Sequence, residues 1–126
     1  MVIFDVSHTP EGAKVAVEEL LKIRQGHTTF VLGVLNDKDL EGMALEFSKV
    51  SDSVIATMPH TKRAFSPEQV RDTMVRFCPD VSVCQDVGAS LRMALARSGK
   101  GDTVIVGGSL YTVGEARRWW DGHEAH

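Results

Sequence analysis

Ionisable and polar side chains directly follow the first apolar run of the chain. Asp5 ends the run at residues 2–4, and Ser7 and His8 come just after it. Carboxylate, hydroxyl and imidazole groups can bind ligands and move protons. Pro-Glu-Gly at residues 10–12 then indicates the start of a helix. A tight strand-to-helix connection needs similar residues, so for Asp5 and His8 a ligand site and a plain turn remain equal alternatives.

Candidate binding residues follow other apolar runs in the same way. Lys38 lies in a polar turn, Arg63 in a flexible loop, and Ser109 in a Gly-Gly-Ser turn. Bare amides at a helix start can hold a carboxylate or phosphate, and arginine can bind a carboxylate through two hydrogen bonds. The structural alternatives are a sharp glycine turn at 107–109 and a solvated charge at Arg63. We interpret the acids Asp37 and Asp86 as helix caps.

Five short apolar runs alternate with segments of helical periodicity. They predict strands at 2–5, 29–34, 53–57, 81–84 and 103–106, and helices at about 10–24, 40–47, 67–77, 87–97 and 110–120. Residues 66–69 match a capping box. Without hairpin signals, this order predicts a single α/β domain over residues 1–126, a mostly parallel sheet of about five strands with helices on both faces. The polar loops would then share one edge of the sheet.

Composition and missing motifs exclude several classes of function. A net charge of −3 offers no basic field for nucleic acid, and no apolar run reaches the roughly 18 residues of a membrane span. We therefore expect a cytosolic protein with no membrane or nucleic-acid partner, and reduced thiols at Cys78 and Cys84. We expect the polar tail at 121–126 to fray and its two histidines, three apart, to be a poor metal site. No phosphate loop, G-x-G-x-x-G motif or nucleophile elbow is present.

Three segments together resemble folylpolyglutamate synthase/dihydrofolate synthase, a family related to the Mur ligases. Residues 4–12, Phe-Asp-Val-Ser-His-Thr-Pro-Glu-Gly, resemble its D-G-A-H-N-P-E-G turn. Residues 34–43 resemble its second loop, which ends D-K-D-x-x-G-M, and residues 108–115 resemble its G-S-L-Y-x-V-G-E segment. The order and the spacing agree along nearly the whole chain.

The resemblance implies the C-terminal domain of that family, a three-layer Rossmann-like lobe. The parent enzymes activate a carboxylate with ATP to an acyl phosphate, and the amine of an amino acid displaces the phosphate. The family's Asp and His near the amino acid and nucleotide would correspond to Asp5 and His8, and its glutamate-contacting Ser to Ser109. Lys38 would match the second-loop Lys, and Arg63 the Arg of the third-loop D-N-P-R.

ATP and magnesium would be bound mainly by a central ATPase lobe that this chain lacks. We therefore expect no cofactor in the isolated chain, and no activity unless that lobe is supplied in the same or another chain. The expected small ligand is glutamate or a related amino acid.

The departures from the family pattern leave a second hypothesis open. Thr9 replaces the usual Asn, Val6-Ser7 replaces Gly-Ala, and His60 replaces the third-loop Asp, which exchanges an acid for a potential cation. A strand that precedes the first motif in the family is also missing. The first hypothesis is the amino-acid-binding lobe of an ATP-dependent ligase. The alternative is a free-standing, non-catalytic ligand-binding or protein-interaction domain derived from that lobe.

Overall fold

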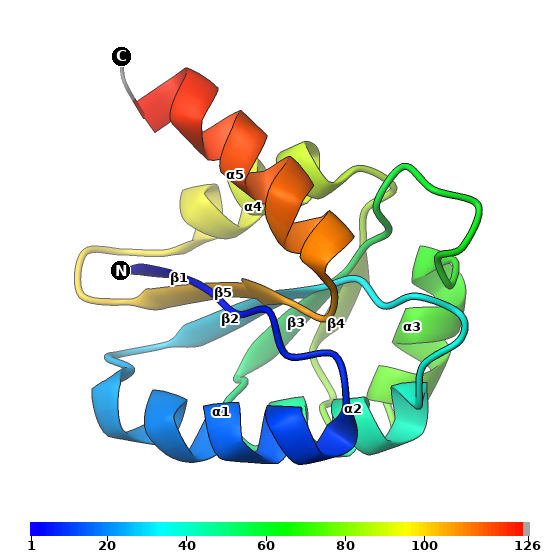
Figure 1. The fold of residues 1–126 in the computed structure, drawn as a ribbon. Coiled ribbons are helices and arrows are strands. Elements are labelled where there is room, and N and C mark those ends of the chain that lie inside the picture. Colours follow the sequence, from blue (N-terminus) through cyan, green and yellow to red (C-terminus); the bar gives the residue numbers. More distant parts are fainter. Residues whose placement is uncertain (125–126) are drawn as a thin grey trace.

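A five-stranded parallel sheet forms the centre of the computed structural model, which describes residues 1–124 (Figure 1). The strand order is β1-β5-β2-β3-β4, and every neighbouring pair is parallel. The strands are β1 (Val2–Phe4), β2 (Thr28–Leu32), β3 (Ser53–Ala56), β4 (Val81–Val83) and β5 (Thr103–Gly107). The predicted α/β class and parallel sheet are confirmed.

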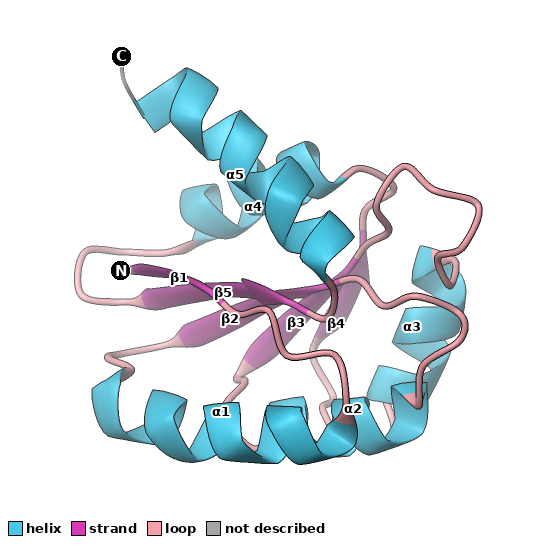
Figure 2. Ribbon diagram, in the orientation of Figure 1, coloured by secondary structure: helices cyan, strands magenta, loops and turns pink. Residues whose placement is uncertain are grey.

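Helices cover both faces of this sheet and complete the three layers (Figure 2). One face carries α1, α2 and α3, and the other carries α4 and α5. The helices are α1 (Pro10–Ile23), α2 (Leu40–Ser48), α3 (Pro67–Met74), α4 (Val87–Arg97) and α5 (Leu110–Glu124). None of the helices within residues 1–124 is long and apolar enough to cross a membrane.

The central strand β2 shows why its sequence is apolar without alternation. Phe30 and Leu32 pack in the core under α1 and α2, whereas Val31 packs in the core under α4 and α5. Phe30 contacts Phe47 of α2, with ring centroids 4.6 Å apart. Since successive side chains of a strand point to opposite faces, a strand covered on both sides must be apolar at every position.

Side-chain caps begin the helices and place the loops between strands and helices. Ser66 and Gln69 form the predicted capping box of α3, and Asp86 caps α4 as predicted, accepting the Ala89 N–H. The cap assigned to Asp37 was wrong. Asp39 caps α2 instead, because its Oδ1 accepts the Gly42 N–H at 2.9 Å.

Some predicted boundaries shift by several residues. β2 ends at Leu32 rather than at residue 34, and α3 ends at Met74 rather than near residue 77. α5 continues through the polar segment 121–124, where we expected fraying. Stacking of His123 on Trp119, at 4.3 Å between ring centroids, contributes to this extension. Ala125 and His126 lie outside the described residues.

Candidate functional site

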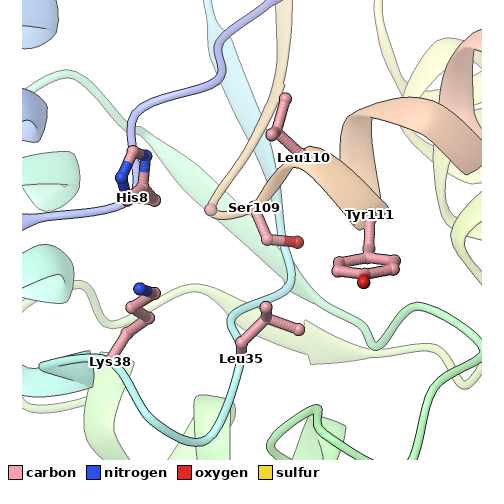
Figure 3. Close-up of a pocket in the computed structure, with 7 residues that line it drawn as sticks. His8, Leu35, Lys38, Ser109, Leu110 and Tyr111 are labelled. Atoms are coloured by element: carbon pink, nitrogen blue, oxygen red, sulfur yellow. The ribbon is translucent and has the colours of Figure 1, made fainter.

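A small pocket lies at the carboxyl edge of the sheet, where the loops after β1, β2 and β5 meet (Figure 3). Its volume is about 150 Å³. These loops are far apart in the sequence, but β1, β5 and β2 are neighbours in the sheet, and this order brings the loops together. The pocket is lined by His8, Leu35, Lys38, Gly108, Ser109, Leu110 and Tyr111. Three of the five predicted site residues therefore share one pocket.

His8 and Lys38 are the two pocket-lining residues whose side chains carry nitrogen atoms. Figure 3 shows them on one side of the pocket, across Ser109 from Tyr111. His8 is exposed, and Lys38 is half-buried with its Nζ 3.9 Å from Asp37 Oδ2. None of the seven lining residues is acidic, so the pocket combines a basic side with apolar walls. Such a lining suits a small ligand that carries a carboxylate.

Ser109 takes part in a chain of hydrogen bonds at the start of α5. Its Oγ accepts the Thr112 N–H at 3.0 Å and lies 2.8 Å from Thr112 Oγ1. Thr112 Oγ1 donates to the carbonyl oxygen of Gly33 at 2.9 Å, so the Ser109 hydroxyl must be the donor between the two side chains. The single Ser109 proton is therefore used inside the protein, and its oxygen can only accept a further hydrogen bond.

Gly108 explains why the turn before α5 needs glycine. Its φ is +106°, and a Cβ atom there would overlap the carbonyl oxygen of Gly33. Both the positive φ and the close approach exclude a side chain. The turn thus packs directly on the end of β2, and Gly108 lines the pocket beside Ser109.

Asp5 is not among the residues that line the pocket. Its half-buried carboxylate accepts the Ser7 hydroxyl at 3.1 Å and the Ser7 N–H at 3.3 Å. Burial raises the pKa of the Asp5 carboxyl above its usual range, and the two hydrogen bonds from Ser7 oppose this shift. In this geometry Asp5 shapes the turn that carries His8, and its contact with a ligand stays a prediction.

Arg63 also lies outside the pocket lining. The guanidinium is exposed, and its Nη2 is 3.9 Å from Asp37 Oδ2, the same oxygen that Lys38 approaches. Asp37 therefore lies between two cations and links the second and third loops. An exposed pair at this distance is weak, so Arg63 keeps the freedom to turn toward a ligand.

His60, the third-loop departure, faces a separate cleft beside the pocket. Its Nε2 lies 3.0 Å from Asp86 Oδ1, and its backbone N–H donates to Glu115 Oε2 at 2.6 Å. This cleft, about 360 Å³ in volume, is lined by His60, Asp86, Gly88, Glu115, Arg118 and Trp119. The imidazole gained at position 60 is thus paired with Asp86 and does not line the smaller pocket.

The side chains of residues 1–124 form no cluster suited to bind a metal ion. Within residues 1–124, no group of three or more His, Cys, Asp or Glu side chains is placed to hold a metal ion. A pocket of about 150 Å³ is also below the roughly 300–1,000 Å³ typical of small-molecule and cofactor sites.

The apolar lining residues were not identified from the sequence. Leu35 and Leu110 looked like ordinary loop and helix residues, yet both contribute pocket walls. The available signal in the sequence was weak: an apolar residue, Leu110, begins a helix directly after a glycine turn. The structure then leaves Leu110 66% exposed. Tyr111, the second residue of α5, is 47% exposed and completes this rim.

Comparison with known proteins gives one consistent family. The sequence profile of the Mur ligase glutamate ligase domain matches residues 1–110. A probable bifunctional folylpolyglutamate synthase/dihydropteroate synthase of Haloferax volcanii is 32% identical over 120 residues, covering 94% of this chain and 14% of the relative. The dihydrofolate synthase/folylpolyglutamate synthase of Escherichia coli is 31% identical over 113 residues, covering 89% and 26%.

Mur ligases and solved structures extend the same relationship. A UDP-N-acetylmuramoyl-L-alanyl-D-glutamate–2,6-diaminopimelate ligase of Caulobacter vibrioides is 27% identical, covering 88% of this chain and 23% of the relative. Escherichia coli FolC in complex with DHPP and ADP superposes with a TM-score of 0.90 at 27% identity, covering 98% of this chain and 29% of that one. The Yersinia pestis folylpolyglutamate synthase/dihydrofolate synthase complexed with AMPPNP and Mn ion gives 0.81 at 29% identity, covering 97% and 28%.

This chain spans less than a third of the length of each of these relatives. The segment that matches is nevertheless continuous and includes all three loops of the pocket. The chain belongs to the Mur ligase family, as a glutamate ligase (C-terminal) domain of the folylpolyglutamate synthase/dihydrofolate synthase type.

Proposed function

We propose that this chain is the amino-acid-binding lobe of an ATP-dependent acid–amino-acid ligase, with glutamate or a related amino acid as its ligand. The observation that carries the proposal is the pocket in which His8 and Lys38 face the turn at Ser109. A carboxylate of the amino acid would bind Lys38 and the backbone N–H groups at the start of α5. Its methylene groups would contact Leu35 and Leu110.

The charge of the pocket favours an acidic over a diamino substrate. A second ammonium group would be buried beside Lys38 with no lining carboxylate to pair with it, which is costly. The glutamate side chain brings the opposite charge. The same positive surroundings disfavour the protonated form of the substrate's α-amine, which must be neutral to act as a nucleophile.

The role of this lobe would be to position the amine. A separate ATPase lobe would hold ATP, and transfer of its γ-phosphoryl group to the acceptor carboxylate would give an acyl phosphate and release ADP. The amine of the bound amino acid attacks the carbonyl carbon, a C–N bond forms, and the C–O bond to phosphate breaks. Phosphate leaves with the electron pair, and the amine proton passes to solvent. Holding the amine in place makes this attack effectively intramolecular, and no step through nucleotide or metal is assigned to residues of this chain.

Calorimetry with the purified chain tests the ligand. L-glutamate should bind, whereas L-lysine and diaminopimelate should not, because both would bury an unpaired ammonium. Binding of a diamino acid in preference to glutamate would contradict the charge argument. The purified chain should neither hydrolyse ATP nor ligate glutamate. Adding the ATPase lobe of a related synthase should restore ligation. ATP turnover by this chain alone would contradict the assignment of ATP binding and hydrolysis to a separate lobe.

The second candidate is a non-catalytic ligand-binding or protein-interaction domain. It is favoured by His60, whose ring is paired with Asp86 instead of facing the pocket, so the acid that the family has in this loop has no counterpart at the same position. Calorimetry with glutamate, folates and nucleotides separates the two candidates, since binding of a ligand outside this set would favour the second. A cytosolic location stays a prediction, and the free thiols of Cys78 and Cys84 agree with a reducing compartment.

A further inference from the structure

We propose that residues 60–65, here called the strap, hold the two walls of the pocket in register and that Glu115 is a positioning residue for the pocket. One wall is the start of α5, with Ser109 just before the helix and Leu110 and Tyr111 in its first turn. The other is the second loop, with Leu35 and Lys38. The proposal rests on the proposed function only in the identity of the ligand.

One end of the strap is attached to α5. The backbone N–H of His60 donates to Glu115 Oε2 at 2.6 Å, across 55 residues of sequence. Glu115 is in the second turn of α5 and belongs to the same rigid helix as the first pocket wall. A carboxylate acceptor makes this a charge-assisted hydrogen bond, about twice as strong as one between neutral groups. The ring of His60 adds a contact to Asp86 at 3.0 Å, at the start of α4.

The other end of the strap is attached to the second loop. The N–H of Asn36 donates to the carbonyl oxygen of Arg63 at 2.6 Å. The N–H of Phe65 donates to the carbonyl oxygen of Val34 at 2.9 Å. Leu35 and Ala64 pair between these two bonds as an isolated antiparallel bridge. The second loop thus forms a short ladder with the strap just before Lys38.

These attachments connect the walls along a route other than the sheet. β2 and β5 join the walls at their base, where each loop leaves its strand. The strap joins them again beyond the sheet, through Glu115 on one side and the ladder at 34–36 on the other. In a pocket of about 150 Å³, a displacement of roughly 1 Å is enough to spoil binding geometry. Glu115 lies outside the lining and therefore acts on the pocket through the strap.

Glu115→Ala and Glu115→Gln separate positioning from simple packing. Alanine removes the acceptor, whereas glutamine keeps an oxygen that can accept the His60 N–H. Asp121→Ala is the matched control, because Asp121 is an exposed carboxylate on the same helix. The measurements are hydrogen exchange at the amides of His60, Asn36 and Phe65, and calorimetry with L-glutamate.

Glu115→Ala should speed exchange at all three amides and weaken glutamate binding about tenfold, which is within the usual range of coupling between sites. Glu115→Gln should recover most of both effects, and Asp121→Ala should change neither. Glutamate should also slow exchange at His60 in the wild type, although this amide lies outside the pocket. Faster exchange at His60 alone, with Asn36 and Phe65 unchanged, would overturn the strap. If glutamate fails to bind the wild type while the three amides still respond together, the strap stands and the ligand assignment falls.

Discussion

The side chain of Thr112, in the first turn of α5, donates a hydrogen bond of 2.9 Å to the carbonyl oxygen of Gly33, just after β2. Both groups are buried, and the two residues are 79 positions apart in the sequence. This bond attaches the wall of the pocket that carries Ser109 to the end of the neighbouring strand. It also explains the orientation of the Ser109 hydroxyl, which donates to Thr112.

Thr112→Val should destabilise the protein, because it leaves the buried Gly33 carbonyl without its side-chain donor. The expected loss in the free energy of unfolding is about 1–3 kcal/mol, the cost of an unpaired buried polar group. Urea unfolding followed by circular dichroism measures it. An unchanged midpoint would mean that the carbonyl finds another donor.

Thr57→Val should instead raise the free energy of unfolding. Thr57 is fully buried, and its hydroxyl has no hydrogen-bond partner among the described residues. Valine keeps the shape and removes the unpaired group, so we expect the protein to gain about 1 kcal/mol of stability. The same threonine-to-valine change is thus made at two buried sites with opposite expected results. A loss at Thr57 would indicate an ordered water bound to its hydroxyl.

Gly108→Ala should cost about 1–3 kcal/mol or more, because a non-glycine residue at positive φ is strained and the new methyl group would also meet the Gly33 carbonyl. Gly122→Ala is the control. Gly122 lies within α5 with open space around it, so alanine should stabilise the helix there by about 0.5–1 kcal/mol. Thermal unfolding of both variants checks the contrast, which would fail if Gly108→Ala were neutral.

Two aspartates should give opposite pH dependences of stability. The pKa of Asp5 is raised in the folded protein, so its favourable contribution is complete below its ordinary value of 3.8 and is lost as the pH rises through the folded pKa. Relative to Asp5→Asn, the wild type should therefore lose stability between pH 3.5 and pH 7. Urea unfolding at a series of pH values measures this difference, and a flat difference would contradict the raised pKa.

The contribution of Asp102 to stability should change with pH in the opposite direction to that of Asp5. Hydrogen bonds from the Gly99 N–H and then the His27 N–H lower the pKa of its carboxyl. Its contribution is present above 3.8 and is lost as the pH falls through the folded pKa. Asp102→Asn should accordingly be less stable than the wild type at pH 7, and the gap should narrow on acidification. A gap that widens at low pH would show the sign to be wrong.

Lys38→Met and Arg63→Met should weaken glutamate binding to different degrees. Lys38 lines the pocket, so losing its charge should reduce affinity about tenfold or more, as expected for a hydrogen bond to a charged group. Arg63 lies outside the lining and should matter less than Lys38. Lys14→Met, at an exposed position on α1, is the control. A larger loss at Arg63 would mean that its side chain turns inward when the ligand binds.

Much of the site was predictable because it follows from strand-to-helix turns. His8, Lys38 and Ser109 each come just after an apolar strand, and a parallel sheet gathers such positions at one edge. The roles of Asp37 and Asp39 were not predictable to the residue, since neighbouring acids in one turn can equally cap the helix. The contacts of His60 with Asp86 and Glu115 could not be predicted either, because they join segments far apart in the sequence.

By itself, the sequence determined the α/β alternation, the buried strands, most of the caps and, through three motifs, the family. These are local properties: periodicity, turn chemistry and residue spacing are read within one segment of the chain. Only the tertiary structure decided which candidates meet. The order β1-β5-β2-β3-β4 places His8, Lys38 and Ser109 in one pocket, leaves Asp5 and Arg63 outside its lining, and connects its walls through the strap. Long-range packing sets that order, and no local pattern encodes it.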